Sequence, residues 1–61
     1  METAFYTPRE VADLLKLRTE TIYEYVREGK LRALRFGNRY RISQADLEAF
    51  LAKARTEGAE G

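Results

Sequence analysis

The spacing of apolar residues predicts a first helix over residues 8–16. Its apolar stripe comprises Val11, Ala12, Leu14 and Leu15. These positions follow the period of about 3.6 residues that marks one face of a helix. Thr7 stands at the N-cap, three residues before Glu10, the spacing of a capping box in which each side chain accepts from the other residue's backbone N–H. Pro8 suits the first helical position, because the N–H that it lacks would have no partner there.

A second helix is predicted over residues 19–28, directly after the first. Its apolar positions are Ile22, Tyr25 and Val26. Gly29 follows as a C-terminal stop in the left-handed conformation, which glycine adopts without steric cost. The link around Leu17 is only two or three residues long, and we expect this leucine to be a buried turn residue. Two short helices joined so tightly are typical of a helix-turn-helix.

Alternating apolar and basic residues then predict two short strands over residues 32–36 and 39–42, joined at Gly37 and Asn38. A two-residue loop would pair Phe36 with Arg39 and would put apolar and basic side chains on the same face. A three-residue loop, 37–39, would instead place Phe36 opposite Tyr40. We favour the three-residue loop, because it gathers the apolar residues against the core.

The favoured register has a consequence for the arginines of this hairpin. It places Arg35 and Arg41 on the outer face and Arg39 at the tip of the loop. Gly37 is expected to be required by the turn itself, since glycine accepts a positive φ.

A third helix is predicted over residues 44–54, with Ser43 as N-cap and Asp46 three residues later. Its inner stripe comprises Leu47, Phe50 and Leu51, continued by Ala54. The sequence thus predicts one domain over residues 1–54 and a flexible tail over 55–61. The predicted core comprises Val11, Leu15, Leu17, Ile22, Val26, Leu31, Phe36, Ile42, Leu47, Phe50 and Leu51.

The composition argues against an enzyme. The chain of 61 residues contains no cysteine and no histidine, and Ser43 is its single serine. It therefore has neither the usual general base nor the commonest metal ligands, and no disulfide is possible. We expect no catalytic residues, no metal site and no cofactor.

The distribution of charge points to a polyanionic partner. The net charge is only +1, but residues 27–42 contain six basic residues and one acidic residue, against five basic and nine acidic residues elsewhere. A concentrated basic segment attracts nucleic acid. The alternative is an arginine-rich surface that is simply solvated.

The sequence shows neither a membrane span nor a signal peptide. No run of about 18 apolar residues is present, and the N-terminus lacks a basic start followed by an apolar stretch. We therefore expect a cytoplasmic protein that does not contact a membrane.

Four segments together resemble the excisionase-type helix-turn-helix family, which is related to the MerR regulators. They are TPREVADLL, TIYEYVREGKL, RFGNRYRI and SQADLEAFL, and the resemblance extends from about Tyr6 to Leu51. It implies a compact winged helix-turn-helix, mostly helical with a small β-hairpin. It also implies a sequence-specific double-stranded DNA-binding protein that is bacterial or phage-encoded. Members of the family serve as recombination directionality factors, as small transcription regulators or as the DNA-binding end of larger proteins.

The resemblance further implies how DNA is contacted. The second helix would enter the major groove, with Arg18, Thr19, Thr21, Tyr23 and Arg27 as candidate contacts. The hairpin wing would reach the adjacent backbone or minor groove through Arg35, Asn38, Arg39 and Arg41. Possible partners are an integrase or further copies of the chain on DNA. No counterpart of the long MerR dimerisation helix follows Ala54, so no small-molecule effector is expected.

Several of these residues have alternative structural interpretations. Tyr23 could cover the core, Arg27 could complement the C-terminal end of its helix, and Asn38 could be a turn residue that tolerates positive φ. Arg18 stands where the family often has a small hydroxyl residue, and we expect Thr19 to cap the second helix instead.

Two carboxylates on the second helix motivate a different function. Glu20 and Glu24 lie on its exposed side, where they repel phosphates, although glutamate can accept from cytosine N4. The alternative is a protein–protein interaction module on a helix-turn-helix scaffold.

Overall fold

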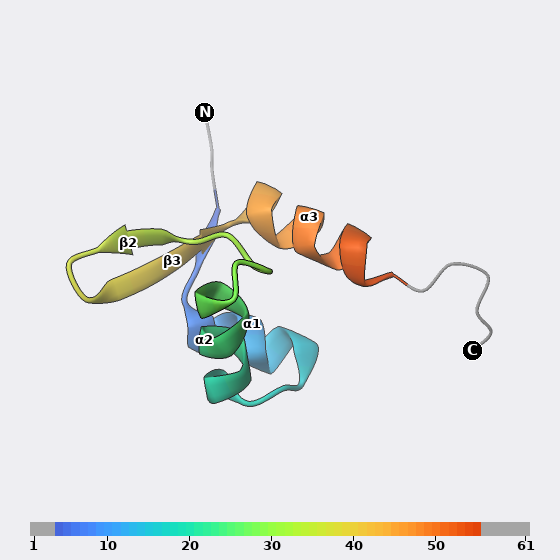
Figure 1. Cartoon of the computed structure of the whole chain (residues 1–61), viewed down its shortest axis with the longest axis horizontal. Coiled ribbons are helices and arrows are strands. Elements are labelled where there is room, and N and C mark those ends of the chain that lie inside the picture. Colours follow the sequence, from blue (N-terminus) through green and yellow to red (C-terminus); the bar gives the residue numbers. More distant parts are fainter. Residues whose placement is uncertain (1–3, 56–61) are drawn as a thin grey trace.

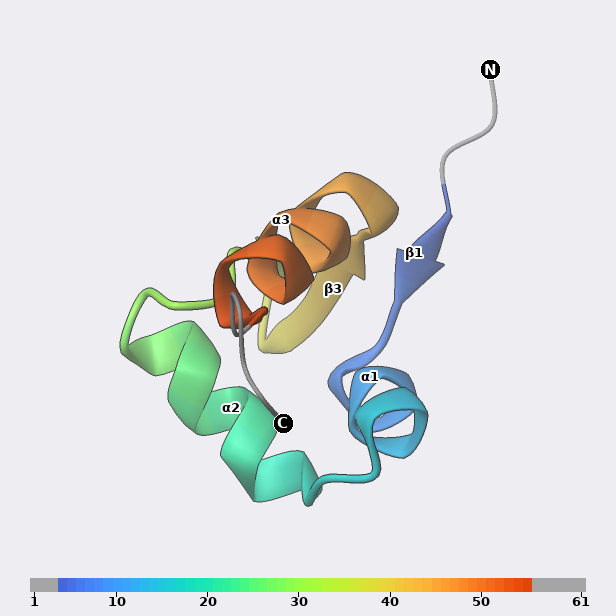
Figure 2. The same cartoon turned by 90° about the vertical axis from the view of Figure 1, so that its right-hand side faces the viewer.

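The computed structural model describes residues 4–55, which form three helices and a small antiparallel sheet (Figure 1). In chain order the elements are β1 (Phe5–Tyr6), α1 (Pro8–Leu15), α2 (Thr19–Arg27), β2 (Leu34–Phe36), β3 (Arg39–Ser43) and α3 (Gln44–Ala54). The predicted class, a mostly helical winged helix-turn-helix, is confirmed. In both cartoon views α1 and α2 form the lower layer, and α3 and the hairpin lie above them (Figure 2).

α1 begins with the predicted capping box. The Glu10 backbone N–H donates to the Thr7 hydroxyl at 3.0 Å, and the Thr7 N–H donates to the Glu10 carboxylate at 2.9 Å. The helix ends one residue earlier than predicted, because Lys16 adopts the left-handed conformation with φ 58°. Its N–H donates back to the Asp13 carbonyl at 3.3 Å, which closes the last turn.

α2 begins without a side-chain cap. Arg18 occupies the N-cap position and makes no capping hydrogen bond, and Thr19 is already the first helical residue. The expectation that Thr19 caps this helix is therefore wrong. α2 ends at Arg27, one residue earlier than predicted. The predicted glycine stop is confirmed: Gly29 has φ 80°, and the Lys30 N–H donates to the Tyr25 carbonyl at 2.9 Å, as in a Schellman motif.

The hairpin is closed by the two-residue loop Gly37-Asn38, so the favoured three-residue loop is wrong. The register pairs Leu34 with Arg41, Arg35 with Tyr40 and Phe36 with Arg39. Of the two loop residues only Gly37, at φ 65°, has a positive φ, the pattern of a type II′ turn, whose twist matches that of the strands. Turn geometry thus sets the register, although it leaves Leu34 and Phe36 on the face away from the core.

β1 was not predicted from the sequence. This strand pairs with β3 in the register Phe5↔Ser43 and Tyr6↔Ile42, which makes β3 the central strand of a sheet ordered β1-β3-β2. The Gln44 N–H extends the pairing by donating to the Ala4 carbonyl at 3.0 Å. A two-residue strand is too short to produce a periodic signal in the sequence.

α3 has the predicted bounds and the predicted cap. The Asp46 backbone N–H donates to the Ser43 hydroxyl at 3.1 Å. The predicted tail lies outside the described residues except for Arg55, which ends the helix in an extended conformation.

The core lies between the helices and the inner face of the sheet. Its buried apolar residues are Val11, Ala12, Ile22, Leu31, Ile42 and Leu47. Three of the other predicted core residues, Leu15, Val26 and Phe50, pack against this cluster while partly exposed.

Three predicted core positions are wrong, namely Leu17 at 41% exposed, Phe36 at 60% and Leu51 at 41%. Leu17 lies in the interhelical turn, where its backbone N–H donates to the Ala12 carbonyl at 2.8 Å. Phe36 is turned outward by the two-residue loop. Leu51 belongs to the C-terminal half of α3, which extends past α1 in Figure 1.

The contrast between Leu47 and Leu51 gives a test of this core. Leu47→Ala should lower the free energy of unfolding by about 2–5 kcal/mol, because it leaves a cavity in the buried cluster. Leu51→Ala removes the same atoms from the same helix and should cost about 1 kcal/mol or less, since that side chain is already partly solvated. Urea unfolding followed by circular dichroism measures both, and equal losses would contradict the packing described.

Candidate nucleic-acid interface

α2 presents most of the predicted contact residues to solvent. Arg18, Tyr23 and Arg27 are exposed, while Thr19 and Thr21 are half-buried. The helix is anchored from its other face by Ile22, which is fully buried. The exposed face of α2 is therefore held rigidly by the core.

The same helix carries exposed acidic residues. Glu20 and Glu24 are both exposed, as the sequence predicts. Arg27 lies in the last turn of α2, where a cation also complements the carbonyl end of the helix. Two exposed carboxylates thus lie between Arg18 and Arg27 along this helix.

Strand pairing divides the wing into two faces. Partners directly opposite each other in an antiparallel pair share a face. The inner sheet face, which covers the core, carries Tyr6, Arg35, Tyr40 and Ile42, and the outer sheet face carries Phe5, Leu34, Phe36, Arg39, Arg41 and Ser43. Arg35 and Arg41 are thus on opposite faces, and the prediction that both lie on the outer face is wrong for Arg35.

An aromatic contact joins the wing to α2. The rings of Tyr23 and Tyr40 meet edge-to-face, with centroids 5.9 Å apart and planes inclined by 64°. The guanidinium carbon of Arg35 lies 6.0 Å from the Tyr40 ring centroid, within the range of a cation–π contact. Arg35 therefore lies on the α2 side of the wing.

Further hydrogen bonds fix the arginines of the wing. The Nε of Arg35 donates to the Gly37 carbonyl at 2.8 Å, which directs its guanidinium toward the tip. A terminal nitrogen of Arg41 donates to the Tyr40 carbonyl at 2.8 Å, and Arg41 is half-buried.

The tip itself is formed by Gly37 and Asn38, so the prediction that Arg39 occupies it is wrong. Arg39 is the first residue of β3, opposite Phe36, and it is exposed. Asn38 is exposed at the tip, but its φ is not positive. The interpretation of Asn38 as a residue chosen to tolerate positive φ is therefore wrong, since Gly37 takes that role.

The positive charges of the wing are not neutralised by acidic residues in the strands. β1, β2 and β3 contain no acidic residue. Within residues 4–55 the one ion pair joins Lys30 to Glu28 at 3.3 Å, so the wing arginines form no salt bridge there. Unpaired guanidinium groups are available to phosphates, which they bind in bidentate fashion.

Tyr40 lies on the surface where the wing meets α2, a position that was not predicted from the sequence. It is half-buried and joins Tyr23 to Arg35. The signal that could have identified it is its spacing of two from Ile42, because residues two apart on a strand share a face. The shared face of Tyr40 and Ile42 was predicted, but the favoured register put Arg35 on the other face, so Tyr40 and Arg35 were not expected to meet.

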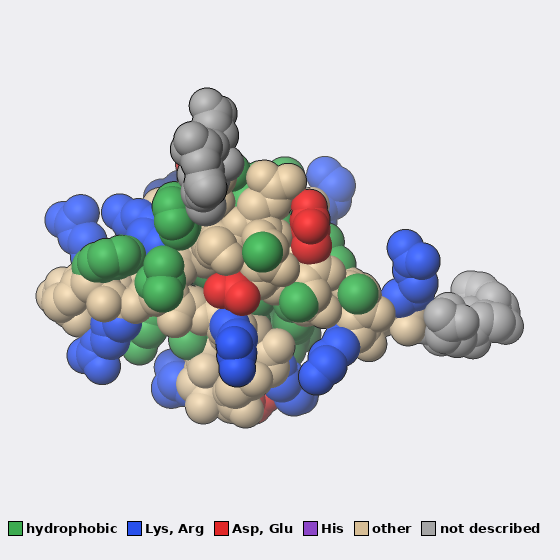
Figure 3. Space-filling model, turned by 90° about the horizontal axis from the view of Figure 1, so that it is seen from above, with side chains coloured by type: hydrophobic (Ala, Val, Ile, Leu, Met, Phe, Trp, Pro, Cys, Tyr) green, Lys and Arg blue, Asp and Glu red, His purple; other side chains and the backbone are tan. Residues whose placement is uncertain are grey.

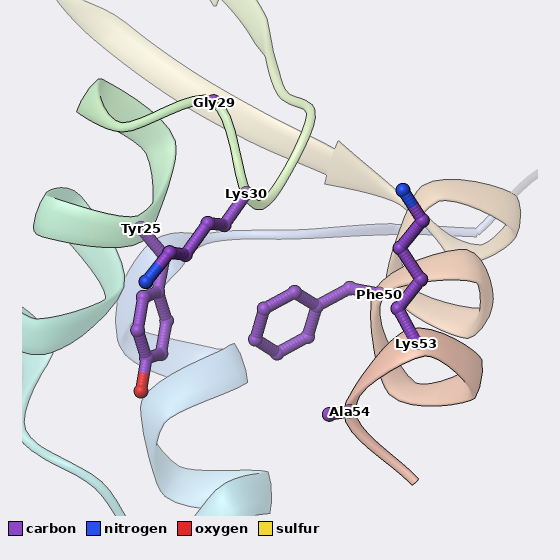
Figure 4. Close-up of a pocket in the computed structure, with 6 residues that line it drawn as sticks. All are labelled: Tyr25, Gly29, Lys30, Phe50, Lys53 and Ala54. Carbon is purple, nitrogen blue, oxygen red and sulfur yellow. The ribbon is translucent and has the colours of Figure 1, made fainter.

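A separate hollow of about 420 Å³ lies between the C-terminal halves of α2 and α3. Its lining comprises Tyr25, Gly29, Lys30, Phe50, Lys53 and Ala54. The rings of Tyr25 and Phe50 point into it, with centroids 5.3 Å apart (Figure 4). No carboxylate lines this hollow, so it assembles no paired acid and base for catalysis.

Neither a metal site nor a membrane span emerges from the described residues. Nowhere in residues 4–55 do three or more potential metal-ligating side chains gather. No helix in this part of the chain combines the length and apolar character needed to cross a membrane.

Comparison with known proteins agrees with this geometry. The family model described as "Helix-turn-helix domain" matches residues 5–55. Among curated proteins, the chain is similar to YvgK of Bacillus subtilis (strain 168), an uncharacterized protein, with 39% identity over 54 residues. That match covers 88% of this chain and 18% of YvgK, so the chain spans less than a fifth of the length of that relative.

The Tyr23–Tyr40 contact can be tested by a double-mutant cycle. Tyr23→Ala and Tyr40→Ala should show a coupling of about 0.5–1.5 kcal/mol in unfolding free energy, because edge-to-face rings attract beyond their buried area. Tyr23→Ala with Phe36→Ala is the matched control, and this pair should be additive within about 0.5 kcal/mol, since Phe36 lies on the outer sheet face. A Tyr23–Tyr40 coupling no larger than that of the control would refute the contact.

Proposed function

The chain belongs to the DNA-binding helix-turn-helix domain family, and from that premise we propose that it is a sequence-specific double-stranded DNA-binding protein. In this proposal α2 enters the major groove and the wing of β2 and β3 reaches the adjacent backbone or minor groove. The Tyr23–Tyr40 contact carries the proposal, because it sets the basic wing beside the exposed face of α2.

α2 supplies the contacts that select sequence. The major groove of B-DNA, about 12 Å wide, admits one helix and displays a distinct pattern of donors and acceptors for each base pair. Arginine can pair with guanine in bidentate fashion, and hydroxyl groups can contact base edges or phosphates. We assign this role to the exposed and half-buried residues of the helix, Arg18, Thr19, Thr21, Tyr23 and Arg27.

The wing supplies contacts that position the protein on the duplex. Arg35 is the strongest candidate, because it lies on the α2 side with its guanidinium directed toward the tip. Asn38 at the tip and the neighbouring Arg39 follow. Arg41 is the weakest of the four, since it is half-buried and already donates to the Tyr40 carbonyl.

The biological role we propose is excision control or transcription regulation. A single small module contacts a short site, so useful specificity requires several copies or a partner protein. We therefore propose an integrase or further copies of the chain as partners on DNA. We place the protein in the cytoplasm of a bacterium, encoded by the bacterium or by a phage.

The two faces of the wing make the proposal testable with a matched pair of substitutions. Arg35→Ala should weaken binding to a random-sequence duplex about tenfold and reduce the slope of log K against log[salt] by about one, because one phosphate contact is lost. Arg41→Ala removes the same charge from the outer sheet face and should have a much smaller effect. Fluorescence anisotropy across a salt series measures both quantities.

Two results would count against this arrangement. Equal losses from the two substitutions would mean that the wing faces DNA in another orientation. Failure of the unmodified chain to bind any duplex at low salt would instead favour the protein-interaction function that Glu20 and Glu24 suggest.

A further inference from the structure

The outer sheet face retains large apolar side chains that the fold does not cover. Phe5 is 47% exposed, Leu34 is 44% exposed and Phe36 is 60% exposed. Their partners on β3 are Ser43, Arg41 and Arg39, three successive outward positions of one strand. The three apolar side chains therefore lie on either side of one row of β3 residues. Together they form one continuous surface.

Among the described residues, the strands of this surface contribute two outward cations and no anion. Arg39 and Arg41 stand in the row between the apolar side chains. No acidic residue occurs in any of the three strands, and neither arginine has an ion-pair partner among the described residues. Figure 3 shows hydrophobic side chains at the hairpin end of the molecule with Lys and Arg side chains on both sides of them, and the acidic side chains lie farther along.

Residues 4–55 leave the large apolar side chains on this side of the sheet exposed. Small domains are built from packed layers, and an apolar sheet face is normally covered by helices or by a second sheet. Here the inner sheet face covers the core together with the helices, and Ile42 is fully buried there. A clustered set of exposed aromatic and aliphatic side chains marks an interaction site.

We propose that the outer sheet face is a docking surface for an acidic amphipathic helix of a partner protein. Apolar residues of that helix would pack on Phe5, Leu34 and Phe36 and cover them. Carboxylates at the edge of its apolar stripe would pair with Arg39 and Arg41, which is the complementarity that a basic and apolar surface offers.

This docking is compatible with DNA binding. The strongest DNA contacts proposed, those of α2 and the inner-face residue Arg35, lie on the opposite side of the sheet from the outer face. Arg39 and Arg41, which rank below Arg35 as DNA contacts, would pair with the partner helix instead. The partner helix and the duplex can therefore occupy the protein together. The inference goes beyond DNA binding and does not require it.

The test uses a defined peptide as the probe. It is a capped, fluorescently labelled helix of about 16 residues, long enough to form in isolation, with leucines at i, i+3, i+4 and i+7 and glutamates beside them. Anisotropy is measured with the full chain, with and without saturating random-sequence duplex. Two control peptides are a scramble of the same composition and a version with Gln in place of Glu.

Leu34→Ser combined with Phe36→Ser should weaken binding of the acidic peptide about tenfold or more, since two apolar contacts are lost. The same double variant should change duplex affinity by about twofold or less, because both side chains lie away from α2. Leu14→Ser is the matched control, since Leu14 is 59% exposed on α1. It should leave peptide binding unchanged. Circular dichroism confirms that each variant is folded.

The proposal is supported if the acidic peptide binds tightly, the scrambled and Gln peptides do not, and the acidic peptide stays bound when the duplex is present. Displacement of the peptide by duplex, or equal binding of the scramble, would overturn the proposal, because the peptide would then be acting only as a polyanion.

A loss of duplex affinity in the double variant would assign the face to DNA. Self-association of the chain that the double variant abolishes would assign it to a second copy. Peptide binding without any duplex binding would sustain this proposal while refuting the DNA-binding function.

Discussion

The burial of Ile42 constrains the rest of this small fold. This residue lies in the central strand of the sheet and is fully buried. Because side chains of a strand alternate between faces, its burial turns Tyr40 inward toward α2 and turns Arg39 and Arg41 outward. The two-residue turn at Gly37 then carries the same alternation into β2, so that Arg35 joins Tyr40 and the apolar pair Leu34 and Phe36 is exposed.

This alternation gives the wing two chemically different faces. The inner sheet face continues from the core to Tyr40 and Arg35, which meet α2 through Tyr23. The outer sheet face combines arginines with aromatic and aliphatic side chains and has no acidic residue. One strand pairing thus sets a basic wing beside α2 and also leaves a second, exposed apolar surface.

Local signals in the sequence predicted the helices well, because their caps are short-range chemistry. Thr7 with Glu10, Ser43 with Asp46, and Gly29 each act within a few residues along the chain. The hairpin register was wrong, because we weighted burial of Phe36 above turn geometry and the turn prevailed. β1 and the exposure of Leu51 depend on long-range pairing and packing, which leave no periodic pattern in the sequence. Of the candidate contacts predicted for the second helix, all but Arg18, which is its N-cap, lie within α2. The face on which each wing arginine lies depends on the strand register.

We propose that DNA contacts α2 and the inner sheet face together. The chain contains no cysteine, so single cysteines can carry a photoactivatable crosslinker at chosen positions. Positions 34 and 35 are adjacent in β2 but face opposite sides of the sheet. We compare the yield of DNA crosslinking from Leu34→Cys and Arg35→Cys with that from Tyr23→Cys on α2. The account predicts efficient crosslinking from positions 23 and 35 and little from position 34. Crosslinking from position 34 that equals or exceeds that from position 35 would contradict it.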